Sequence, residues 1–206
     1  MFDFNILMKG GPLIILIMLC SITALAIFLE RLIHLHRAQI DTEKFLVGIR
    51  NIIRKGNIVE ATSICENTPG PTAHILKEGL IRHDRDRAEI KEAIEDAGLH
   101  EVPRLEKNLP VLATIAHIAP LLGLLGTVSG MIKTFMMIQQ KGGIVNPGDL
   151  AQGIWEALIT TAAGLVVAIP SYVAYNYLVS RVDGFVLEME RSASELLNIL
   201  TEGETL

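Results

Sequence analysis

The chain has 206 residues, of which 50% are hydrophobic, and its mean hydropathy of +0.41 is too high for an average water-soluble domain. The formal net charge is only −5, and no basic patch of the kind that binds nucleic acid stands out. The sequence contains no metal-ligand spacing, no phosphate-binding glycine loop and no nucleophile triad. These features argue against a soluble enzyme and predict no metal or other cofactor.

Three long stretches contain no Asp, Glu, Lys or Arg: residues 10–29, 108–132 and 157–180. A bilayer core about 30 Å thick needs roughly 20 apolar residues in a helix, so each stretch is long enough to cross it. The first has only Lys9 as a basic flank and no small-x-small cleavage site, so we interpret it as a span and not as a signal peptide. The sequence therefore predicts an all-α integral membrane protein with three transmembrane helices.

The polar segment 30–107 separates the first two spans and holds 13 of the 18 basic residues, with 14 acidic residues interspersed. Close to the membrane, Arg31 follows span one and Arg104 precedes span two, whereas the 139–150 connection offers only Lys141. Basic residues near span ends favour the cytoplasmic side. We therefore expect the segment and the C-terminus in the cytoplasm, and the N-terminus and the 139–150 turn in the periplasm.

The polar regions show the periodicity of helices. "TEKFLVGIRNIIRKGN", "NIVEATSICEN" and "AHILKEGLIRH" each predict a short helix, and "TPGPT" separates the second from the third. From residue 85 the helical period continues into span two, which predicts one long helix reaching from the cytoplasm into the membrane. The tail after span three has an apolar stripe that requires a partner helix.

These patterns divide the chain into four expected regions. They are an outward N-terminus with the first transmembrane helix (1–29), a cytoplasmic helical domain (30–107), the second and third transmembrane helices with a short periplasmic turn at 139–150 (108–180), and a cytoplasmic C-terminal helix (181–206).

Small residues recur at helical spacing in the second and third spans. Gly123, Gly126 and Gly130 form a ridge on span two, and Gly164 belongs to a similar face on span three. Small-xxx-small patterns allow membrane helices to approach closely. The pattern predicts contact between these two spans or between subunits, and packing alone could explain the glycines.

Several polar residues interrupt the same two spans. Glu156 lies about 8–9 Å inside the outer end of span three, and an intramembrane carboxylate is a candidate functional group. Helix capping or snorkelling is the structural alternative. Thr127 lies within the glycine ridge, Thr160 shares a helix face with Glu156, and Thr161 is rotated by about 100° from Thr160. His117 could relay protons, although a packed histidine is the more common case.

Two stretches carry a resemblance to a known family. "LATIAHIAPLLGLLGTVSGMIKTF" (112–135) and "GIWEALITTAAGLVVAIP" (153–170) closely resemble the MotA/TolQ/ExbB proton channel family, and the ExbB and TolQ branch more than flagellar MotA. The resemblance implies a pentameric ring in the bacterial inner membrane around single-span helices of an ExbD/TolR-like partner. That partner would carry protons on an aspartate, and a TonB/TolA-like transducer would pass on the work for transport or envelope processes.

The resemblance also assigns expected roles to individual residues. Thr127 and Thr161 match the family's pore threonines, and Glu156 matches the glutamate that opens the third-span motif. These three form the expected ion pathway. Thr160 stands where the family usually has a small residue, and His117 stands where the family often has another polar or small residue.

Two other functions remain open at this point. A non-conducting scaffold would use the same helices only to oligomerise. A sodium-driven or flagellar-type stator relative would use a different ion or a different client.

Overall fold

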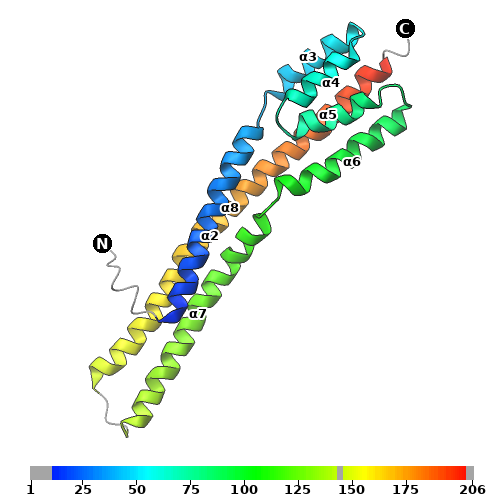
Figure 1. Cartoon of the computed structure of the whole chain (residues 1–206). Coiled ribbons are helices and arrows are strands. Elements are labelled where there is room, and N and C mark those ends of the chain that lie inside the picture. The colour runs from blue at the N-terminus through cyan, green and yellow to red at the C-terminus, as the bar shows by residue number, and fades with distance from the viewer. Residues whose placement is uncertain (1–10, 143–145, 203–206) are drawn as a thin grey trace. The chain divides into compact units, whose positions relative to one another are not determined.

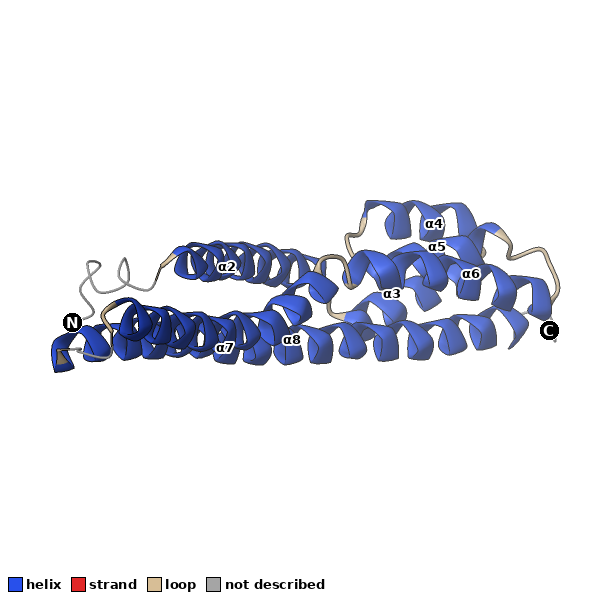
Figure 2. Cartoon of the chain, turned by 90° about the horizontal axis from the view of Figure 1, so that it is seen from below, coloured by secondary structure: helices blue, strands red, loops and turns tan. Residues whose placement is uncertain are grey.

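The computed structural model describes residues 11–142 and 146–202. Throughout these residues the protein consists of helices and connecting turns, and no strand occurs among them (Figures 1 and 2). The helices are α2 (Pro12–Ala38), α3 (Thr42–Arg54), α4 (Ile58–Asn67), α5 (Pro71–Ile81), α6 (Arg87–Leu105), α7 (Leu109–Gln140) and α8 (Pro147–Glu202). The all-α prediction is confirmed.

Three helical stretches of the described chain are long and apolar enough to cross a membrane. They are Pro12–Arg54, Arg87–Gln140 and Leu150–Thr201, and each overlaps one of the charge-free runs. Large apolar side chains such as Leu121, Val166 and Ile169 remain more than half exposed on them. Such surfaces suit a lipid environment, where the helix satisfies its own backbone hydrogen bonds. The three-span prediction is therefore confirmed.

Contacts divide the chain into two compact units. The membrane unit comprises residues 1–29 and 108–177, and the polar unit comprises residues 30–107 and 178–206. Parts of the predicted regions lie outside the described residues, namely 1–10, 143–145 in the expected periplasmic turn and 203–206 in the expected C-terminal helix.

The polar unit is built from short helices with defined starts. Asp41, Asn57 and Asp86 precede α3, α4 and α6, and each side chain accepts a hydrogen bond from the backbone N–H three residues further on. Such caps satisfy donors that a helix start leaves unpaired and typically contribute about 1 kcal/mol each. Helix α4 contacts both α3 and α5, and α5 contacts α6.

The last part of α8 supplies the partner helix for this unit. Thr42 Oγ1 donates to Glu188 Oε2 at 3.0 Å, and Arg50 forms an ion pair with Glu195. The apolar stripe predicted for the tail is buried, and its buried members are Val182, Phe185, Met189, Leu196 and Leu197. Burial of this stripe within the polar unit stabilises the helical conformation of the tail.

One expectation is wrong: no single helix runs from residue 85 into span two. Helix α6 ends at Leu105 and α7 begins at Leu109, with Asn108 in the left-handed conformation at φ 66°. Pro110 has no N–H, and its ring would collide with the carbonyl four residues earlier in a continuous helix. Proline is well suited to the first turn of a new helix, and Pro110 lies in the first turn of α7. Pro103 and Pro120 lie inside α6 and α7 without ending them.

Cys65 provides a test of the polar unit's core. Its side chain is fully buried in α4, and burial raises the pKa of the thiol to about 12. At pH 8 the reactive thiolate is then only about one part in ten thousand of the total. We expect Cys65 in a Cys20→Ser background to resist iodoacetamide at pH 8 and to react after unfolding, as followed by intact-mass spectrometry.

The matched control places a thiol two residues away on the exposed surface of α4, with Ser63→Cys in a Cys20→Ser, Cys65→Ser background. This thiol should react rapidly in the folded protein. Equal labelling rates at the two positions would contradict the buried placement of Cys65.

Candidate functional site

Helices α7 and α8 run side by side within the membrane unit, and small residues line their contact (Figure 1). A β-carbon at Gly123 would lie 3.0 Å from Thr161 Cα, and one at Gly126 would overlap the Thr160 side chain. A β-carbon at Gly164 would lie 2.5 Å from the Ala119 carbonyl oxygen. These distances are too short for any larger residue without a shift of the backbone.

We call Gly123, Gly126, Gly130 and Gly164 the glycine seam. A β-carbon at Gly130 would lie 2.9 Å from Ala157 Cβ, so the seam extends over two turns of α7. Close approach of this kind brings backbone carbonyls within reach of side chains on the opposite helix. The structure thus places all four predicted packing glycines at one helix contact within a single chain.

Thr161 uses this approach to bond across the seam. Its hydroxyl donates to the carbonyl oxygen of Gly123 on α7 at 2.9 Å. In an α-helix the same carbonyl also accepts the backbone N–H four residues on, which belongs to Thr127. The Thr161 hydroxyl therefore bonds the carbonyl group that also accepts the backbone N–H of Thr127, whereas the Thr127 hydroxyl has another partner.

Thr127 is half-buried, and its own hydroxyl donates to the Leu124 carbonyl at 2.7 Å. Thr161 is half-buried as well. Each hydroxyl has thus used its single proton on a backbone carbonyl, while its oxygen lone pairs can still accept. The two side chains offer acceptor oxygens at the surface of the seam.

Thr160 is buried, unlike the half-buried Thr161 that follows it. Its side chain is only 1% exposed and packs on Gly126, and its hydroxyl donates to the Glu156 carbonyl at 2.8 Å. A threonine that bonds the carbonyl four residues earlier satisfies itself within its own helix. Thr160 is therefore a packing residue of the seam.

Glu156 forms an ion pair across the same two helices. Its Oε1 lies 2.9 Å from Lys133 Nζ, and its side chain is 25% exposed. A β-carbon at Gly11, just before α2, would lie 2.9 Å from the same oxygen. The carboxylate therefore lies where all three membrane helices come together, with a cation beside it.

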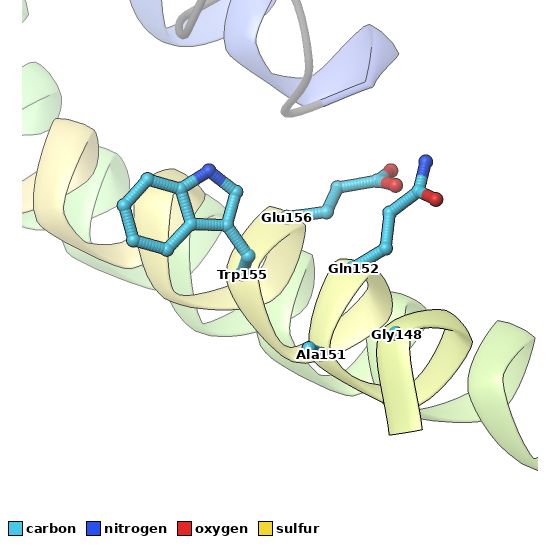
Figure 3. Close-up of a pocket in the computed structure, with 5 residues that line it drawn as sticks. All are labelled: Gly148, Ala151, Gln152, Trp155 and Glu156. Atoms are coloured by element: carbon cyan, nitrogen blue, oxygen red, sulfur yellow. The ribbon is translucent and has the colours of Figure 1, made fainter. Parts of the chain in front are cut away.

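The carboxylate also borders an open pocket of about 460 Å³ in the first turns of α8. Figure 3 shows the side chains of Gln152 and Glu156 pointing the same way from α8, with Trp155 directed to another side. The two polar groups are one helical turn apart and share a face. The pocket thus combines a polar wall with an aromatic side chain suited to a membrane interface.

Sequence reasoning missed Lys133 as the partner of Glu156. The signal was present in the glycine ridge, because 123 opposes 161, 126 opposes 160 and 130 opposes 157. An antiparallel pair in this register brings residue 133 opposite the turn that contains residue 156. The register follows only from the contact of these glycines with α8 in the same chain.

His117 lies at the same helix contact, farther from Glu156. Its Nδ1 is 2.7 Å from the Ala113 carbonyl oxygen, and its ring meets Tyr172 edge to face with centroids 6.4 Å apart. His117 is exposed, and a proton relay through it stays a prediction.

Groups of three or more metal-ligating side chains do not occur in the described ranges 11–142 and 146–202. The polar groups instead form a line along two membrane helices, from the ion pair at one end, past the threonines, to His117. The class of protein that these features define is a multi-pass helical membrane protein with hydroxyl and charged groups at a close contact between two spans.

The family follows from comparison with known sequences. Residues 67–191 match the MotA/TolQ/ExbB proton channel family, and the chain belongs to this family. The match includes the glycine seam, both threonines and Glu156. The family resemblance noted in the sequence is thereby confirmed.

Named relatives come from the ExbB and TolQ branch. A putative biopolymer transport protein ExbB homolog of Methanothermobacter thermautotrophicus is 32% identical over 88% of this chain and 64% of that protein. The biopolymer transport protein ExbB of Aquifex aeolicus is 49% identical over 42% of this chain and 57% of that protein. The Tol-Pal system protein TolQ of Haemophilus influenzae is 37% identical over 58% of this chain and 54% of that protein. The matched part of this chain thus spans less than two thirds of each of these relatives.

The glycine seam can be tested by overpacking one of its members. Gly126→Leu should lower the free energy of unfolding by about 1–3 kcal/mol, because Thr160 occupies the space that the new side chain needs. The measurement is a denaturant titration of the detergent-solubilised protein followed by circular dichroism. Gly184→Leu is the control, since nothing lies within 4 Å of a β-carbon there and α8 should gain helix propensity. Equal effects of the two changes would contradict the seam.

The Lys133–Glu156 pair can be tested with a double-mutant cycle. We compare Lys133→Met, Glu156→Gln and the double variant by the same unfolding measurement. Both side chains are partly exposed, so the coupling free energy should be about 0.2–1 kcal/mol in favour of the pair. A coupling of zero within error would show that the two charges do not interact.

Proposed function

We propose that this chain is an ExbB/TolQ-like subunit of an inner-membrane motor that is driven by the proton-motive force. The observation that carries the proposal is the pair of half-buried threonines at the glycine seam, whose hydroxyls donate to the Gly123 and Leu124 carbonyls, in a member of a proton channel family. The motor would energise TonB/TolA-type transport or envelope processes. The names of the relatives, biopolymer transport protein and Tol-Pal system protein, support this role.

In the proposed assembly, five copies form a ring around the helices of an ExbD/TolR-like partner. The large apolar side chains that stay exposed on α7 and α8 provide surface for such neighbours as well as for lipid. A TonB/TolA-like protein would receive the work. The N-terminus and the turn at 139–150 would face the periplasm and the C-terminus the cytoplasm, in line with the charge asymmetry of the sequence.

The threonines suit a path on which a partner carboxyl gains and loses a proton. The protons of Thr127 and Thr161 are donated to backbone carbonyls, so their oxygens are positioned to accept. A protonated carboxylic acid has an O–H to donate to them, whereas a carboxylate has none. With both threonine hydroxyls bonded to backbone carbonyls, the seam therefore favours the neutral form of the partner's carboxyl. Rotation of a threonine hydroxyl away from its carbonyl would let it donate to the charged form.

Glu156 would stand at the outer end of this path. Its charge is balanced by Lys133 at 2.9 Å, and the open pocket beside it admits water. In this role the carboxylate holds the outer ends of the spans together and orders water at the entrance. The proton-carrying group is then the partner's carboxyl.

A scaffold that does not conduct is the second candidate, and one observation favours it. The Thr161 hydroxyl forms an interhelical bond, which could be its whole purpose. Such bonds contribute only about 0.6 kcal/mol on average in membrane proteins. Removal of the hydroxyl should therefore leave the helices packed, so loss of ion flow can be separated from loss of structure.

The decisive experiment measures proton uptake by vesicles that contain this chain and a co-produced single-span ExbD/TolR-like partner. Thr161→Val should reduce gradient-driven uptake by about tenfold or more, because the acceptor oxygen is lost while the side-chain shape is kept. Thr161→Ser, which keeps the hydroxyl, should retain uptake. Thr23→Val is the control, since its hydroxyl bonds the Leu19 carbonyl on the exposed surface of α2.

The possible results separate the candidates. Normal uptake with Thr161→Val, or no uptake by the unmodified complex with its transducer present, would reject the motor. Loss with Thr161→Val together with intact assembly on size-exclusion chromatography supports it. Replacing sodium by potassium at a fixed proton gradient tests the sodium-driven alternative, because only a sodium-coupled motor would stop.

A further inference from the structure

An open pocket of about 490 Å³ lies within the polar unit, where α2, α5 and α6 meet. Its wall includes Arg31 and His34 of α2, His74 of α5, Arg104 of α6 and Lys107. Arg31 comes two residues after the first charge-free run, and Lys107 directly precedes the second. Two residues of helix correspond to about 3 Å, so these groups belong to the depth of the lipid headgroups.

The two carboxylates of this pocket are already occupied by cations of the chain. Glu30 Oε2 accepts from Arg31 Nε at 2.9 Å, and its other oxygen is paired with the same guanidinium. Glu101 lies 2.6 Å from Arg104 Nη1 and 3.4 Å from His74 Nδ1. The acidic groups therefore serve to position basic side chains, and they leave little negative charge to repel an anion.

Arg31 is held especially firmly. Its side chain is only 3% exposed, and its Nη1 donates to the Arg104 carbonyl oxygen at 3.1 Å. This bond ties the end of α6 to α2 on the floor of the pocket. A cation fixed in this way needs no reordering when a ligand binds, which reduces the cost of binding.

Two further donors at the rim have no partner within the described part of the chain. Lys107 and His34 are exposed, line the pocket, and form no recorded hydrogen bond or ion pair. Together with Arg104 they present an ammonium, an imidazole and a guanidinium to one open space. Lysine and arginine are the usual ligands of phosphate oxygens.

We propose that this pocket binds a phosphate group, presented by the headgroup of an anionic phospholipid. Its volume falls in the range of sites that enclose a small ligand, so it has room for a phosphate with its glycerol substituent. Arg31 and Lys107 adjoin the charge-free runs in the sequence, which favours a phosphate at the level of the lipid headgroups. The site is separate from the glycine seam, and it does not depend on ion flow or on the orientation of the termini.

Native mass spectrometry of the purified full chain in neutral detergent tests this site. Phosphatidylglycerol is titrated against the protein, with phosphatidylcholine as the zwitterionic comparison. The unmodified protein should bind phosphatidylglycerol at least about fivefold more tightly than phosphatidylcholine, and Lys107→Gln should weaken that binding by about tenfold. Lys55→Gln is the matched control: it removes the same charge from an exposed position outside the pocket.

Glycerol 3-phosphate at millimolar concentration distinguishes the two sources of phosphate. Competition by it would show that the pocket takes soluble phosphate esters as well as lipids, and lack of competition would assign the pocket to lipid. Equal weakening by Lys107→Gln and Lys55→Gln, or no preference for phosphatidylglycerol, would overturn the proposal.

Discussion

The close approach of α7 and α8 is the constraint on which the arrangement of polar groups depends. Glycines bring the two backbones near enough for Thr161 to reach the Gly123 carbonyl at 2.9 Å. The same approach sets the register that places Lys133 beside Glu156. In a bilayer, where apolar surfaces gain little from leaving lipid, packing of small residues and hydrogen bonds must supply this contact. The close approach of the α7 and α8 backbones therefore positions both the threonine hydroxyls and the Lys133–Glu156 ion pair.

Each polar side chain near the seam is compensated inside the chain. Thr127, Thr160 and Thr161 donate to carbonyls, and Glu156 has a lysine beside it. Compensation lowers the cost of placing these groups in a membrane. The three threonines differ in accessibility: Thr160 is buried against Gly126, while Thr127 and Thr161 stay half-exposed. Of these three threonines, Thr127 and Thr161 are the two that can meet a group from another chain.

At Asn108 and Lys133 the structure shows what the sequence pattern did not predict. The spacing of apolar residues remains helical through residues 105–109. This spacing does not reveal the break, because a single left-handed residue does not change the pattern. Pro110 was the sequence feature that indicated a new helix start, since proline is favoured in the first turn of a helix. Lys133 was visible as the end of a charge-free run, but its partner lay 23 residues away on another helix. Its identification required the register of the two helices.

The sequence by itself determined the three spans, the helical class, the family motifs and the candidate residues. These follow from local properties: the length of apolar runs, the spacing of small residues, and the identity of polar residues within them. The tertiary structure alone decided which hydroxyls are buried, where each donates, which cation faces Glu156, and which basic groups surround the pocket of the polar unit. Those depend on distances between atoms of segments far apart in the chain, which composition and periodicity do not contain.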